Sequence, residues 1–265
     1  MKQPTLFIPH GGGPCFFMRP GDGWATGTWD RMGEYLKGIA STLRARPKAI
    51  VIISGHWEER PPSIYAPTTS KLLFDYSGFP DYTYHLRYPA PSDAAVGRLV
   101  LQLLQEGGFA CGENDERGFD HGVFIPLMLI YPNADVPVVQ LSLEAGYDPE
   151  RHLAIGRALA PLRDEGVLIV GSGMSYHNLR AFGDARENGP AAEFDAWLTD
   201  AVINAPLRAK TLTNWQSAPG ALRAHPHPEH LIPLFVAAGA AMDEPAVRDY
   251  SDFILGKAVS GFRFG

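Results

Sequence analysis

Apolar and polar positions along the chain alternate between two patterns, one typical of buried strands and the other of amphipathic helices. Short apolar runs rich in β-branched residues predict four strong strands, at 5–10, 49–56, 136–143 and 167–173. One or two further strands are expected to close the chain within 247–264.

Helical periodicity fills the segments between these strands. From 28 to 46, apolar residues recur every three or four positions, and Pro47 ends the pattern. The other predicted helices run from an N-cap at Ser92 to Gly107, from Asp148 and Pro149 to Gly166, over about 190–203, and from Pro228 to 241 with a kink near Pro233.

Strands that alternate with helices are typical of an α/β fold, with a central, mostly parallel sheet and helices on both faces. The sequence has no repeat, low-complexity segment or linker, so we expect residues 1–265 to form a single domain. Residues 60–91 are rich in Pro, Tyr and Gly and predict a long irregular loop. Such loops in compact domains usually carry function.

Composition narrows the classes of function. The net charge of −6 disfavours a nucleic-acid partner or an anionic membrane surface. No apolar run approaches the ~20 residues of a membrane span, and the first residues lack the apolar stretch of a signal peptide. The two cysteines, Cys15 and Cys111, form neither a disulfide framework nor a cysteine-based zinc site, which favours the cytoplasm.

Histidines lie at or just past the ends of three of the four strong strands: His10, His56 and His177. In open α/β sheets, ligands bind outside the carboxyl ends of the strands, so these segments can bring their imidazoles to one place. We expect His10 and His56 to share a site there. His230, near the start of the last predicted helix, and His121, in "GFDHGVF", are further candidates.

Clustered imidazoles suit zinc or non-haem iron. Glu229 offers a carboxylate beside His230, but adjacent helical residues point about 100° apart, so only one of the two can face the metal. We favour His230, which gives a three-histidine set. The remaining histidines are expected on the surface or in structural roles: His85 and His152 on the surface, and His225 and His227 structural, with His227 a possible N-cap.

The glycines after His10 have three competing interpretations: a phosphate-binding loop, an esterase oxyanion loop, or room for a substrate beside a metal-ligating His10. A phosphate-binding loop is disfavoured because Pro14 lacks an amide donor and no Gly-Lys-Ser/Thr follows. An esterase oxyanion loop would need a Gly-x-Ser-x-Gly elbow, and the nearest match, "GMSYH" at 173–177, has a histidine in place of the second glycine. A metal-dependent hydrolase stays open, because metal-bound water is a general nucleophile.

Seven motifs occur in the order found in class III extradiol ring-cleavage dioxygenases, which the chain resembles over nearly its whole length. The similarity is greatest to the DOPA 4,5-dioxygenase branch, related to the catalytic subunit of protocatechuate 4,5-dioxygenase. The motifs are "PHGGGP", "SGHW", "FDYSGFPDYTYHLRYPAP", "GFDHGVFIPL", "VPVVQLSL", "GSGMSYHNL" and "PHPEHLIPL".

The resemblance implies a metal site at the carboxyl ends of the strands. His10, His56 and His230 match the family's metal positions. His177 matches a position that either ligates the metal or acts as the acid/base beside it, and His121 matches a second catalytic histidine. The family implies Fe(II) for activity, and Zn(II) in proteins of this branch when isolated.

The implied reaction inserts both atoms of O2 into a catechol beside its two hydroxyls. Phe79, Tyr82 and Tyr84, in the 74–91 loop, are candidates to sandwich the ring, and Arg87 to meet a substrate carboxylate. The glycines after His10 are then expected to leave clearance for metal and substrate. The alternatives are a zinc hydrolase and a non-catalytic metal-binding interaction protein on the same fold, and we expect a monomer or small homo-oligomer.

Overall fold

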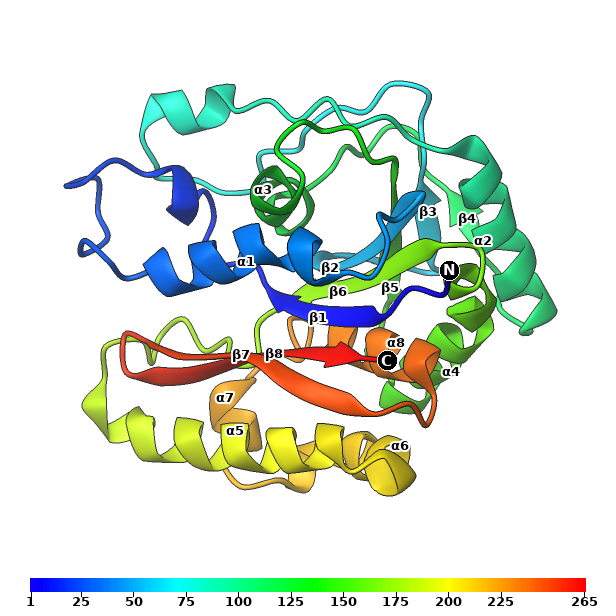
Figure 1. The fold of residues 1–265 in the computed structure, drawn as a ribbon. Helices are drawn as coiled ribbons and strands as arrows, with labels where there is room; N and C mark the ends of the chain where they lie inside the picture. Colours follow the sequence, from blue (N-terminus) through cyan, green and yellow to red (C-terminus); the bar gives the residue numbers. More distant parts are fainter.

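The computed structural model describes residues 1–265 and places eight strands in one sheet (Figure 1). The order across the sheet is β4-β3-β5-β2-β6-β1-β8-β7. The strands are β1 (Thr5–Pro9), β2 (Ala49–Glu59), β3 (Ser63–Tyr65), β4 (Gly112–Glu113), β5 (Val138–Glu144), β6 (Val167–Gly173), β7 (Ala246–Ile254) and β8 (Lys257–Phe264).

The centre of the sheet is parallel, as the sequence predicts. β5, β2, β6 and β1 run in one direction, so their carboxyl ends meet at one edge. The antiparallel pairs lie toward the sides, where β3 pairs with β5, β8 with β1, and β7 with β8. The four strong apolar runs therefore form the middle of an α/β sheet.

Helices cover both faces of the sheet. In Figure 1, α1 and α3 lie above the sheet, while α5 and α7 lie below it. No helix is both long and apolar enough to cross a membrane. The helices are α1 (Asp30–Thr42), α2 (Ala94–Glu106), α3 (His121–Ile130), α4 (Pro149–Leu159), α5 (Asn188–Ile203), α6 (Arg208–Thr213), α7 (Ala221–Ala224) and α8 (Ile232–Ala241).

The last of these helices, α8, is enclosed on all sides. All ten of its residues are buried, because it lies between the sheet, against β6 and β1, and α4. A helix that is apolar all round is the expected solution for such a position. The segment just before it, which carries His230, is therefore fixed against the sheet.

Two predicted helix starts are wrong. Asp93, not Ser92, caps α2: its Oδ1 accepts hydrogen bonds from the amides of Ala95 and Val96 at 2.9 and 3.1 Å. Ser92 instead donates to the carbonyl of Val138, 2.8 Å away on β5. Pro233 is the second residue of α8, where its missing N–H costs nothing, so it starts the helix rather than kinking it.

The prediction that His152 lies on the surface is also wrong, because its side chain is fully buried in α4. Its Nδ1 donates to the carbonyl of Asp148 at 2.7 Å, and its Nε2 accepts from the amide of Glu144 at 3.0 Å. His85 is exposed, as predicted. His225 is buried and bonds the carbonyl of Ser175 at 2.9 Å, a structural role. His227 is exposed and caps no helix, because α8 begins only at Ile232.

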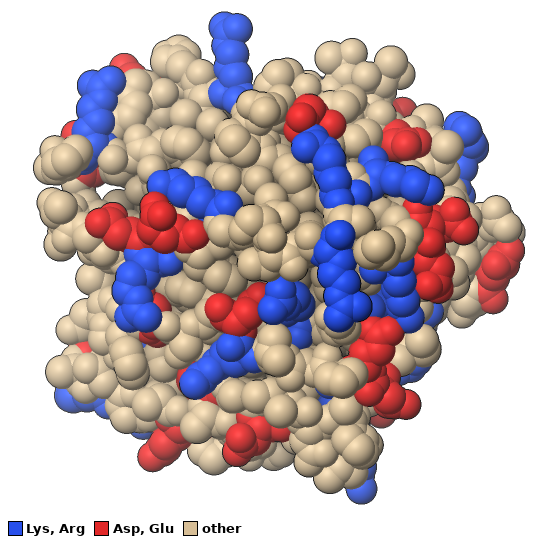
Figure 2. Space-filling view, in the orientation of Figure 1, with Lys and Arg blue, Asp and Glu red and all other residues tan.

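Charges of both signs are interspersed on the molecular face of Figure 2. Several form surface ion pairs, such as Arg46 with Asp135 at 2.5 Å. Exposed pairs of this kind contribute little to stability, so packing of the sheet and helices holds the fold together.

We predict that the contact between α4 and α8 tolerates no side chain at Gly156. A Cβ there would lie 2.2 Å from the carbonyl oxygen of Val236, on a helix that has no room to move. Gly156→Ala should lower the free energy of unfolding by about 2 kcal/mol through overpacking. Gly38 in α1 has open space around it, so Gly38→Ala should raise the free energy of unfolding by about 0.5–1 kcal/mol. Denaturant titration measures both, and equal effects would contradict the packing argument.

Candidate functional site

Three histidines from distant parts of the chain converge at the carboxyl edge of the sheet. His10 directly follows β1, His56 lies in β2, and His230 lies two residues before α8. Nε2 of His56 is 3.2 Å from Nε2 of His10 and 3.0 Å from Nε2 of His230. The structure thus brings together three of the four histidines predicted as metal ligands.

Hydrogen bonds on the opposite ring nitrogens fix the tautomers of these histidines. Glu229 Oε1 lies 3.0 Å from Nδ1 of His230, and a carboxylate only accepts, so this Nδ1 carries the proton. Nδ1 of His10 lies 3.0 Å from Oγ of Ser172, whose own proton is donated to the carbonyl of Gly122. Nδ1 of His10 is therefore also a donor.

Nδ1 of His56 makes an ion-pair contact with Asp75 Oδ2 at 3.5 Å, and this negative charge favours a proton on Nδ1. Nε2 of His56 then faces the lone pairs of Nε2 on both His10 and His230, with no proton between them. Such an arrangement is unfavourable by itself and is satisfied by a cation held between the rings. The donor set therefore fits a metal ion.

The protonation states agree with this geometry. Burial and then the nearby imidazole of His56 hold the pKa of His10 well below its usual range. Burial and His177 do the same for the pKa of His230, and burial and His121 lower the pKa of His56 to about 3. These imidazoles are neutral at physiological pH, which is the form that binds metals.

Glycines on β2 and β6 allow the His230 segment to reach the sheet. A Cβ at Gly173 would lie 2.1 Å from the carbonyl oxygen of His230, and a Cβ at Gly171 would lie 2.3 Å from that of Pro233. At Gly55 it would lie 3.1 Å from Cα of His230. Side chains at these positions would push His230 away from the other two histidines.

His177 lies beside this cluster but is held differently. Its ring stacks on that of His230, with centroids 3.3 Å apart. Its Nδ1 is 3.1 Å from the same Oε1 of Glu229 that bonds His230. Burial alone would raise the pKa of Glu229, but its bond to His177 lowers the pKa below the usual range. Glu229 thus faces the Nδ1 side of both rings, where it orients them.

His121, the first residue of α3, completes the group. Its Nδ1 lies 2.8 Å from Oδ1 of Asp75, which also accepts from the backbone amide of His121 at 3.0 Å. Burial would raise the pKa of Asp75, but the bond and charge of His121, followed by the charge of His56, lower it to about 2. The His121 ring lies 4.0 Å from that of His56. Sequence reasoning missed Asp75 and the orienting role of Glu229, because both depend on partners distant in the chain.

The histidines open into a cavity of about 560 Å³. Apart from the histidines and Gly11, Gly12 and Gly13, its wall is aromatic and aliphatic. Phe79, a predicted substrate contact, is part of the wall. The other wall residues are Trp24, Trp29, Tyr76, Met174, Leu179, Phe182 and Leu255.

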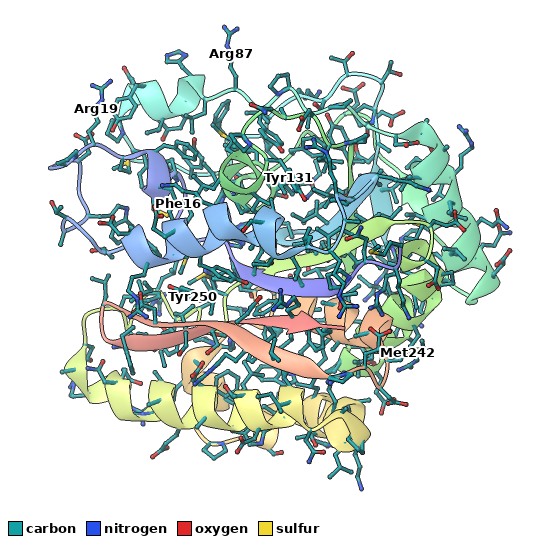
Figure 3. All side chains as sticks on the ribbon, viewed as in Figure 1. Phe16, Arg19, Arg87, Tyr131, Met242 and Tyr250 are labelled. Carbon is teal, nitrogen blue, oxygen red and sulfur yellow. The ribbon has the colours of Figure 1, made fainter.

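The other predicted substrate contacts lie outside this wall. The Tyr82 hydroxyl bonds Asp22, and the Arg19 guanidinium covers the Tyr82 ring at 4.2 Å. The Tyr84 hydroxyl accepts from the amide of Phe79 at 3.4 Å, so it supports the wall from behind. Arg87 points away from the protein (Figure 3). The 74–91 loop therefore contributes Phe79 and Tyr76 to the cavity wall. The other predicted contacts, Tyr82, Tyr84 and Arg87, are not part of it.

The glycines after His10 are required by the backbone conformation as well as by the space in the cavity. Gly11 and Gly13 have φ of 81° and 55°, a conformation that side chains rarely adopt. A Cβ at Gly11 would collide with Cys15 Sγ at 2.4 Å, and one at Gly13 with the Phe79 ring at 2.9 Å. The expectation that they only leave clearance for metal and substrate is therefore incomplete.

The chain is similar in sequence to known ring-opening dioxygenases. A family model for the catalytic LigB subunit of aromatic ring-opening dioxygenase matches residues 4–255, a range that includes the five histidines of the cavity. Dioxygenase tasH from Hapsidospora irregularis is 38% identical, with 99% of this chain and 85% of that protein covered. The 4,5-DOPA dioxygenase extradiol from Beta vulgaris is 42% identical over 74% of each chain.

Among solved structures, an uncharacterized protein from Escherichia coli K12 has a TM-score of 0.78 and 28% identity, with all of both chains covered. The sheet and its helices are therefore similar in a protein of known structure.

We predict that Zn²⁺ binding will raise the melting temperature of metal-free protein. At about 100 times its Kd, a ligand specific for the folded state adds about 2.7 kcal/mol, or roughly 5–10 °C here. His56→Ala should lose most of this increase, because it removes the central nitrogen of the cluster, whereas His85→Ala should retain it. Scanning calorimetry with and without Zn²⁺ measures the shift. An unchanged shift in His56→Ala would show that the metal binds elsewhere.

Proposed function

The chain belongs to the class III extradiol dioxygenases, in the LigB family and of the DOPA-dioxygenase type, and on that premise we propose the finer details of its reaction. The substrate is a catechol, and its ring opens beside the two hydroxyls, with O2 as the second substrate. The observation that carries this proposal is the close approach of the unprotonated Nε2 atoms of His10 and His230 to that of His56, beside an aromatic cavity. We further propose that residues 1–265 act as one catalytic domain.

His10, His56 and His230 would hold the metal, and His177 would remain outside the ligand set. Fe(II) is the metal we propose for activity, and Zn(II) would fit the same nitrogens in isolated protein. Bound Fe(II) would supply a Lewis-acidic, redox-active centre for the catechol and O2. Neutral imidazoles leave such a centre with its full positive charge, which favours a deprotonated catechol.

His177 is the base that we propose for the catechol hydroxyl. Its Nδ1 faces the Glu229 carboxylate, so Nε2, on the other side of the ring, is the nitrogen placed to accept a proton. The stacked ring of His230 fixes the orientation of the His177 ring. The proton is therefore accepted next to the site where the catechol oxygens bind.

His121 is the second acid/base group, on the other side of the cluster. Asp75 accepts from its Nδ1, which leaves its second nitrogen to hold or deliver a proton to oxygen atoms of the substrate. Phe79 and Tyr76 contribute an aromatic wall against which the substrate ring packs, and they exclude water there.

The alternatives of a zinc hydrolase and a non-catalytic metal-binding protein receive no support. The relatives described above are dioxygenases by name, and the family model is that of a catalytic subunit. Both acid/base candidates are also present and oriented by carboxylates. A metal-binding scaffold would not need this arrangement.

We predict that protein loaded anaerobically with Fe(II) consumes O2 when a catechol is added and forms a yellow product. His177→Ala should lower kcat by roughly 10²–10⁴-fold, as expected for loss of a general base. His85→Ala should match the unchanged protein, since His85 is exposed and outside the cavity. An oxygen electrode and an absorbance spectrum follow the reaction. Full activity in His177→Ala at equal iron content would contradict its role.

Asp75→Asn tests the carboxylate that orients His121 and that also faces Nδ1 of the proposed ligand His56. The amide can present an N–H to Nδ1 and reverse the tautomer, so kcat should fall at least about tenfold. The KM for catechol should change little. Asp22→Asn is the matched control, because Asp22 bonds Tyr82 outside the cavity wall. Equal kcat values for the two variants, at equal iron content, would show that Asp75 has no positioning role.

A further inference from the structure

We propose that the ring substituent of the substrate is uncharged and apolar, and that Leu179, Phe182 and Leu255 contact it at one side of the cavity. This inference rests on the proposed function, because it concerns the catechol of that same site. It differs from the expectation of a substrate carboxylate bound by Arg87.

The first observation is that the cavity wall contains neither lysine nor arginine. Its ionisable side chains are five histidines and Tyr76. The nearest carboxylates, Asp75 and Glu229, bond those histidines from behind and add negative charge near the site. A substrate carboxylate packed against this wall would lose part of its hydration without gaining a counter-ion, which is unfavourable.

The arginines around the site do not supply this counter-ion. Arg117 donates to the carbonyl of His56 at 2.7 Å and pairs with Asp120 at 3.2 Å, and it covers the Trp57 ring. Arg180 follows Leu179 in the chain, but its exposed side chain is not part of the wall.

The second observation is an exposed apolar edge on the cavity. Leu179 is 70% exposed and Leu255 is 38% exposed, although both line the cavity. Phe182 is a half-buried residue of the same wall and packs on Tyr176. The amide of Gly183 donates to the carbonyl of Leu255 at 3.2 Å, which joins the two segments. Because both leucines also line the cavity, a ligand group bound there would cover their exposed apolar surface.

The third observation is the strained backbone of Leu255. This residue and Gly256 form the two-residue turn between β7 and β8, with φ of 47° and 84°. Turns with two positive φ angles prefer Asn-Gly, and a leucine in this conformation is disfavoured. A strained, half-exposed leucine in a cavity wall is typical of a side chain retained for binding rather than for folding.

Two catechols of nearly equal size test the proposal. In 4-ethylcatechol the substituent ends in a methyl group, and in 3,4-dihydroxyphenylacetate it ends in a carboxylate. Anaerobic calorimetry on the Fe(II)-loaded protein should give a Kd at least about tenfold lower for 4-ethylcatechol, because the carboxylate loses hydration without a cationic partner in the wall. The ratio of kcat/KM in oxygen should favour 4-ethylcatechol in the same way.

Substitutions in the cavity wall then test which residues determine the preference between the two catechols. Leu179→Arg should shift the preference toward the carboxylate at least about fivefold by adding a counter-ion. Leu222→Arg is the control, because Leu222 is 60% exposed but lies outside the cavity. Leu255→Asn should raise the melting temperature by relieving the turn, and should weaken binding of 4-ethylcatechol.

The outcomes separate this inference from the proposed function. Cleavage of both catechols with equal or tighter binding of the carboxylate would overturn the inference and leave the function standing. If Arg180→Gln abolished a preference for the carboxylate, Arg180 would be the counter-ion, which also overturns it. Iron-loaded protein that takes up no O2 with either catechol would overturn both.

Discussion

The site depends on how closely the His230 segment approaches the sheet. The carbonyl of His230 accepts from the amide of Met174 at 3.0 Å, at a position where a Cβ on Gly173 would lie 2.1 Å away. Gly55 and Gly171 remove the other obstacles. Because α8 is enclosed between the sheet and α4, this contact cannot relax, and His230 stays beside His56, 174 residues earlier in the chain.

The same arrangement of polar groups orients the histidines of both the metal site and the acid/base pair. A polar acceptor lies behind each imidazole, on its Nδ1 side: Ser172 for His10, Asp75 for His56 and His121, and Glu229 for His177 and His230. Each acceptor places the proton on Nδ1 and leaves Nε2 free on the other side of the ring. Where these Nε2 atoms meet they suit a metal, and where one stands apart it suits a base.

The sequence predicts the central strands and the histidines at their ends, because apolar runs and strand-end placement are local signals. It does not reveal partners that are distant in the chain. Ser92 bonds β5 instead of capping α2, His152 is buried by α4, and Asp75 and Glu229 acquire their roles only after folding. The family resemblance indicates that His121 and His177 match catalytic positions. It does not show whether His177 is a metal ligand or a base.

X-ray absorption at the metal edge tests the central claim most directly, with Fe(II)-loaded protein and its His177→Ala variant. The structure predicts the same shell of three imidazole nitrogens in both, because His10, His56 and His230 converge through Nε2 while His177 bonds Glu229. Loss of one imidazole from the shell in His177→Ala would contradict the account and make His177 a ligand.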